Sequence, residues 1–174
     1  GRQSLVGAIP GLPNGLALER TGSLLVAEIE HGILYRLHPD GRSEVVLDRL
    51  GGQKLGAVNF VLIDDRDRIW VTVSTRRVPR RPAATTPSHD GYILLIDAAG
   101  PRIVADGLCF ANEVRVDAEG RHLFVVETAL RRISRYAIGP DSELLDKATY
   151  GPEDIGGRPD GIALDALLEK RSTG

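Results

Sequence analysis

The stretch LCFANEVRVDAEGRHLFVVETALRRISRYAI, residues 108 to 138, decides the fold class of this chain. Apolar and polar side chains alternate from Glu113 to Val116, and residues 123 to 126 form an apolar run rich in β-forming residues, so both segments are predicted strands. Ala118-Glu119-Gly120 supplies the turn between them, and Gly139-Pro140 ends a third predicted strand. Because no helical period is sustained, we expect an all-β fold.

The same pattern occurs at three other places in the chain. Each copy opens with an asparagine or aspartate at the start of an apolar strand, and these anchors are Asn14, Asn59, Asn112 and Asp160. Consecutive anchors lie roughly 45 to 55 residues apart, and in the first three copies a turn and a second apolar strand follow. A repeat of this length, built of about four strands, is typical of a β-propeller blade.

We expect a single, partial β-propeller domain over residues 1–174. Closed propellers have about four to eight blades, whereas this chain has room for about three to four. Its last copy breaks off and methionine is absent, which indicates a fragment or a processed chain. Open blade edges favour association with another copy of the chain. The predicted blades are 14–57, 58–107 and 108–158, with a polar connector at 140–158, and another blade starts at 159–174.

Composition and charge indicate a soluble globular protein. The 174 residues are 42% hydrophobic, and the net charge of −2 gives no general attraction to nucleic acid or to an anionic membrane. No apolar run is long enough for a membrane span or an export signal. Cys109 is the single cysteine, which is compatible with a reducing compartment, so a cytoplasmic location is expected.

The anchors of the repeat are also the candidate site. The innermost strands of successive blades line one central channel, so Asn59, Asn112 and Asp160 are predicted to face a common axis. Their oxygen atoms suit Ca²⁺, Mg²⁺ or, less selectively, Zn²⁺. A cation there would polarise a carbonyl oxygen, and Asp160 would take a proton from the attacking water. The alternative is that these residues only favour turns, and spacing alone favours that interpretation.

Four stretches of the chain resemble the family of SMP-30/regucalcin, gluconolactonase and related lactonases. They are PNGLALERTGSLLVAEIEHGILYRL, VNFVLIDDRDRIWVTVSTR, the segment from Asp90 to Ile138, and GRPDGIALDA. The resemblance implies a six-bladed propeller and a hydrolase that opens lactone or related ester rings. It also implies one divalent cation, Ca²⁺ before Zn²⁺ or Mg²⁺, held by Asn59, Asn112 and Asp160. Asp160 is then also the catalytic general base or nucleophile.

The chain departs from this family at two places. The remaining family ligand is a first-blade glutamate in a Glu-Gly-Pro context, and no such stretch precedes Asn14. Glu28 and Glu127 lie on second strands and are not expected to replace it. Ala57 stands where sugar-lactone members tend to carry an arginine. The missing blades would also impair activity in the chain as it stands.

Two other functions fit the blade pattern. One is a non-catalytic β-fold that binds a small molecule or assembles with itself. The other is a strictosidine synthase-like propeller, and the Asn and Asp anchors argue against it. Cys109 and Trp70 are expected in the core, and the arginines of residues 76–81 in a solvated loop near the channel mouth. Surface or turn positions are expected for the histidines, which are His31, His38, His89 and His122.

Overall fold

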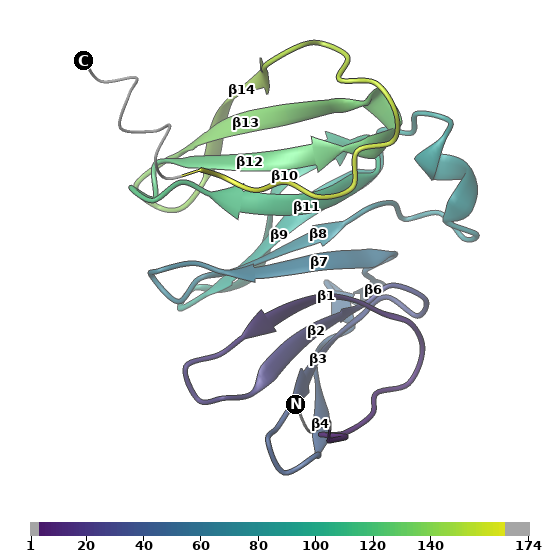
Figure 1. Cartoon of the computed structure of the whole chain (residues 1–174), viewed down its shortest axis with the longest axis vertical. Coiled ribbons are helices and arrows are strands. Elements are labelled where there is room, and N and C mark those ends of the chain that lie inside the picture. The colour runs from purple at the N-terminus through teal and green to yellow at the C-terminus, as the bar shows by residue number, and fades with distance from the viewer. Residues whose placement is uncertain (1–3, 166–174) are drawn as a thin grey trace.

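The computed structural model describes residues 4–165, which are built almost entirely from antiparallel β-strands. Three four-stranded sheets follow one another along the chain, and Figure 1 shows them one above another. The first contains β1 (Pro13–Leu18), β2 (Leu24–Glu28), β3 (Ile33–Leu37) and β4 (Ser43–Leu47). The second contains β7 (Val58–Ile63), β8 (Ile69–Val73), β9 (Gly91–Asp97) and β10 (Gly100–Leu108). The third contains β11 (Ala111–Val116), β12 (His122–Glu127), β13 (Arg132–Ile138) and β14 (Leu144–Tyr150).

The remaining elements are short. The hairpin of β5 (Arg49–Leu50) and β6 (Gln53–Lys54) connects the first sheet to the second. Residues 4–165 contain two 3₁₀ turns, η1 (Arg81–Ala84) in the loop between β8 and β9 and η2 (Thr128–Leu130) directly after β12. Among the residues described, no helix is long and apolar enough to cross a membrane.

The hydrophobic core lies between neighbouring sheets. Successive residues of a strand point to opposite faces of its sheet, so the middle sheet has two buried faces. On β8, Val71 packs with Leu25 of the first sheet, whereas the adjacent Trp70 packs with Val125 of the third. This explains why β8 is apolar almost throughout, and Trp70, predicted as core, is fully buried.

The innermost strands β1, β7 and β11 begin at the same end of the molecule. β7 contacts both of the others. At its start, the side-chain amide of Asn14 donates to the backbone carbonyl of Asn59 at 2.9 Å. A Cβ atom at Gly15 would lie 2.7 Å from the Cα of Phe60, so glycine at this position permits the close approach of β1 and β7. The anchors of consecutive repeats therefore lie next to one another.

The fold class predicted from the repeat is confirmed: the sheets are propeller blades, each carrying its anchor near the start of its innermost strand. One local prediction was wrong. Residues 140–158 were expected to be a polar connector, but β14 runs from Leu144 to Tyr150 and closes the third sheet. This strand is the outer edge and most of its residues are exposed, so its sequence lacks the alternation that marks a half-buried strand.

The start of the predicted fourth blade lies beside β11. The backbone N–H of Glu113 donates to the carbonyl of Asp160, and the Glu113 carboxylate accepts from the N–H of Ile162 at 3.0 Å. Figure 1 shows this C-terminal segment in yellow next to the third sheet. The remainder of the predicted segment, from residue 166 onward, lies outside the described residues.

Candidate functional site

A line of hydrogen bonds joins the anchor residues of the first and second blades. The buried side chain of Asn59 accepts a hydrogen bond from the Asn14 amide at 2.9 Å and donates one to the Ser74 hydroxyl at 2.8 Å. Ser74 in turn donates to the backbone carbonyl of Ala111 at 2.8 Å. Since Ala111 precedes the next anchor, Ser74 connects the Asn59 side chain to the backbone that carries Asn112.

The third blade repeats this arrangement with threonine in place of serine. The side-chain amide of Asn112 donates to the Thr128 hydroxyl at 3.2 Å and to an oxygen of the Asp160 carboxylate at 2.6 Å. Thr128 donates to the backbone carbonyl of Pro159 at 2.7 Å. Because Pro159 precedes Asp160, the hydroxyl and the amide together fix where Asp160 lies. The structure thus brings Asn112 and Asp160, two of the three predicted ligands, into contact.

Ser74 and Thr128 were not identified from the sequence. Each follows directly after the second strand of its blade, β8 or β12, and the matching position of the first blade is Ile29. A hydroxyl residue at this point in two of the three complete copies is the available sequence signal. Its meaning depends on the hydrogen bonds to the anchors, which the sequence alone does not contain.

A pocket of about 500 Å³ opens beside Asn112 and Asp160. One wall comes from the loop between β8 and β9. Ala83 and Ala84 of η1 pack against Phe110 and Ala129, which holds this part of the loop against η2. The described residues that line the pocket are three arginines and six others, namely Arg80, Arg81, Ala84, Thr85, Phe110, Asn112, Thr128, Arg158 and Asp160. The arginine-rich loop expected near the channel mouth therefore contributes two guanidinium groups to the wall of the candidate site.

The site offers amide and carboxylate oxygen atoms, which are the types of ligand that a hard cation prefers. Both amide hydrogens of Asn112 are used by Thr128 and Asp160, so its carbonyl oxygen is left for a ligand. Asp160 adds a carboxylate, and such oxygens are the usual ligands of Ca²⁺ and Mg²⁺. Asn59 differs, because it does not line the pocket and its carbonyl oxygen already accepts from Asn14. The three predicted ligands form one connected line, but only two of them face the pocket.

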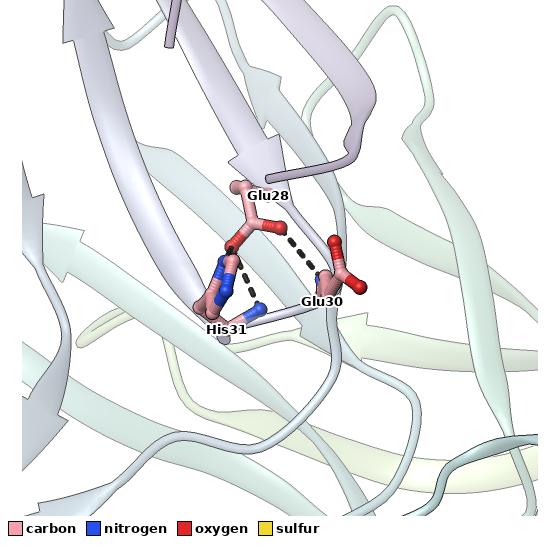
Figure 2. A group of neighbouring side chains, drawn as sticks. All are labelled: Glu28, Glu30 and His31. Carbon is pink, nitrogen blue, oxygen red and sulfur yellow. Dashed lines mark hydrogen bonds and ion pairs between the residues drawn. The ribbon is translucent and has the colours of Figure 1, made fainter. Parts of the chain in front are cut away.

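Figure 2 shows a second group of potential ligands, Glu28, Glu30 and His31, whose ligand atoms lie within 4.8 Å of one another. The fully buried carboxylate of Glu28 accepts hydrogen bonds from the backbone N–H groups of Leu12, Glu30 and His31, at 2.7 to 2.8 Å. These bonds occupy both carboxylate oxygens. Glu28 therefore fixes the turn after β2, and we assign no cation to this cluster.

Glu127 occupies the equivalent place at the end of β12 and is also fully buried. It accepts hydrogen bonds from the Ser134 hydroxyl at 2.5 Å and from the backbone N–H of Cys109 at 2.9 Å, and it pairs with Lys147 at 3.0 Å. Burial alone would raise the pKa of Glu127, but these hydrogen bonds and the Lys147 charge hold the pKa below its ordinary range. Its role in the fold is therefore structural.

The cysteine and the histidines do not contribute to this pocket. Cys109 is fully buried, as expected, and burial followed by the Glu127 charge raises the pKa of its thiol. A thiol held in its neutral form is a poor nucleophile. None of the histidines lines the pocket, and they are His31, His38, His89 and His122.

Three successive blades, each with an asparagine near the start of its innermost strand, define this protein as a β-propeller. The chain belongs to the SMP-30/gluconolactonase/LRE-like family, whose model matches residues 5–170. Among solved structures it is similar to a gluconolactonase from Xanthomonas campestris, with a TM-score of 0.73 and 22% identity over 88% of this chain and 52% of that one. A luciferin-regenerating enzyme gives a TM-score of 0.64 with 13% identity, covering 82% of this chain and 48% of that one. At these identities the likeness shows the fold.

Curated relatives match over most of this chain but over less than half of their own length. The chain is 28% identical to the adipocyte plasma membrane-associated protein of Gallus gallus, covering 90% of this chain and 39% of that protein. It is 30% identical to the Arabidopsis thaliana protein Strictosidine synthase-like 2, covering 87% of this chain and 43% of that protein. Strictosidine synthase-like proteins are therefore among the curated relatives that this chain resembles in sequence.

Proposed function

We propose that the protein is a hydrolase of the lactonase type, which opens a lactone or related ester ring in the pocket beside Asn112 and Asp160. The observation that supports this most is the 2.6 Å hydrogen bond that holds the Asp160 carboxylate at the pocket wall. Membership of the SMP-30/gluconolactonase family supports the same chemistry. The alternative of a non-catalytic β-fold has no comparable support from the site.

Asp160 is the proposed general base. One of its carboxylate oxygens accepts from Asn112, and the other remains for a water molecule in the pocket. The base takes a proton from this water as the oxygen attacks the lactone carbonyl carbon. The bond between that carbon and the ring oxygen then breaks, and the ring oxygen takes up a proton. The products balance as one lactone plus one water giving one hydroxy acid.

Asn112 has two proposed roles in this reaction. Its amide group keeps the Asp160 carboxylate turned toward the pocket, and its carbonyl oxygen is a ligand for a divalent cation. Asp160 supplies the second ligand, and Asn59 contributes directly or through water. The cation, most suitably Ca²⁺, would polarise the substrate carbonyl. Water would supply further ligands of the coordination shell.

The proposed activity can be tested by following acid release from a panel of four- to seven-membered lactones at constant pH. We expect ring opening above the uncatalysed rate that stops on chelation of divalent cations and returns with excess Ca²⁺. The same panel without protein and with heat-denatured protein provides the controls. Rates equal to these controls with Ca²⁺, Mg²⁺ and Zn²⁺ alike would contradict the proposed function.

A further inference from the structure

Among the residues that the structure describes, three arginines of the site have no ion-pair partner, unlike most of the other arginines. Most of the other described arginines pair with a carboxylate, as Arg76 does with Asp106 and Arg102 with Asp97. Within residues 4–165, the side chains of Arg80, Arg81 and Arg158 form no ion pair or hydrogen bond, yet all three line the pocket beside Asp160. Unpaired guanidinium groups gathered on one pocket indicate a missing anionic partner.

The packing of η1 brings two of these arginines to the pocket. Ala83 and Ala84 are buried against Phe110, which lies directly before β11. This contact positions the preceding residues, Arg80 and Arg81, at the end of the third blade where Asn112 lies. Arg80 is only half-exposed, so its stem is confined by the surrounding chain.

Arg158 reaches the same pocket from the C-terminal segment. The Thr128 hydroxyl holds the adjacent residue Pro159 through its backbone carbonyl. The three guanidinium groups thus come from two segments that are fixed independently, one by η1 and one by Thr128. Their common location is a product of the tertiary fold and not of one charged run in the sequence.

We propose that Arg80, Arg81 and Arg158 bind a carboxylate or phosphate group on the substrate, a role that rests on the hydrolase function proposed above. Arginine presents a planar fork of donors that matches both anions. Among the described residues that line this pocket, Asp160 is the one carboxylate, and it repels an anion. The anionic group therefore turns toward the arginines, and the uncharged lactone carbonyl turns toward Asn112 and Asp160. The substrate class is an anionic lactone.

Anion binding can be tested apart from catalysis by titrating the purified chain with inorganic phosphate and, separately, with malonate. We expect saturable binding of one or both, weakened about tenfold in Arg158→Gln and by more in the double variant Arg80→Gln and Arg81→Gln, because charged hydrogen bonds are lost. The preferred probe tells phosphate from carboxylate recognition. The matched control is Arg66→Gln, an exposed and unpaired arginine that lines a different hollow at the other end of β7.

The anion site would be overturned if Arg158→Gln and the double variant bound phosphate and malonate as the parent does. An equal loss of affinity in Arg66→Gln would also overturn it. Measurements of lactone hydrolysis then distinguish failure of the anion site from failure of the proposed hydrolase function. A γ-lactone bearing a carboxylate should be hydrolysed with a higher kcat/KM than the neutral γ-lactone, and Arg158→Gln should remove that preference. If no lactone is hydrolysed but the arginine variants still lose phosphate or malonate binding, the hydrolase function fails and the anion site stands.

Discussion

Asp160→Asn is expected to lower kcat for lactone opening by about 10²- to 10⁴-fold, the usual contribution of a general base. Asparagine keeps the size of the side chain, and its oxygen still accepts the hydrogen bond from the Asn112 amide. It removes the negative charge, and with that charge the capacity to take a proton and to hold the proposed cation. The fold should therefore remain intact while the chemical step fails.

The measurement is the initial rate of acid release with saturating substrate and Ca²⁺, alongside circular dichroism of each variant. Asp141→Asn is the matched control, since Asp141 is exposed and lies between β13 and β14, outside the residues that line the pocket. It should retain the parent rate. An Asp160→Asn variant that is folded and within twofold of the parent would show that another group is the base.

Glu127→Gln is expected to lower the free energy of unfolding at pH 7 by about 3 kcal/mol, at the lower end for breaking a buried ion pair. The change removes the charge that Lys147 faces at 3.0 Å and Arg132 at 3.2 Å. Both cations are partly exposed, and water will relieve some of the loss. Urea unfolding measures the effect, and the exposed Glu153→Gln should change stability by less than about 0.5 kcal/mol.

The effect of Glu127→Gln should depend on pH in a defined direction. Burial opposes ionisation of Glu127, but the Ser134 and Cys109 hydrogen bonds and the Lys147 charge outweigh it, so the folded pKa lies below the ordinary 4.5. A group with a lowered folded pKa stabilises the protein above the unfolded pKa and loses this contribution as the pH falls. The stability difference between parent and variant should therefore narrow below about pH 4.5. A difference that stays constant from pH 7 to pH 3 would contradict the assignment.

The blades could be predicted because one sequence pattern, an asparagine or aspartate followed by a run of apolar residues, is repeated at the spacing of propeller blades. Trp70 and Val71 show why the pattern is readable: adjacent residues enter different cores, so the strand is apolar on both faces. β14 was not predicted, because it lacks such an apolar pattern. As an outer strand it buries little apolar surface, and its sequence resembles a loop.

The closeness of Asn112 and Asp160 was also predictable, because the two residues hold matching positions in consecutive sequence repeats. The arginines of the pocket were not. Their placement depends on Ala83 and Ala84 packing against Phe110, which lies more than twenty residues away in the sequence. Small alanines in a polar loop carry no pattern that reveals such a contact. The hydroxyls of Ser74 and Thr128 likewise acquire their role only through tertiary hydrogen bonds.

The pocket places opposing demands on a cation. Asp160 attracts it, whereas Arg80, Arg81 and Arg158 line the same pocket and repel it. Calcium affinity rises with the number of charged ligands, so a site with a single carboxylate is expected to bind weakly, with Kd about 10⁻⁴ to 10⁻³ M. An anion held by the arginines would offset this repulsion, so substrate and cation are expected to favour each other's binding.

Calorimetric titration of the purified chain with Ca²⁺ tests the proposed site most directly. The account predicts saturable binding of one ion per chain in the stated range, abolished in Asp160→Asn and unchanged in Asp141→Asn. Because both variants remove one negative charge, a difference between them reports the site and not the net charge. Absence of binding at millimolar Ca²⁺, or equal binding by Asp160→Asn and the parent, would contradict the assignment of Asn112 and Asp160 as the cation site.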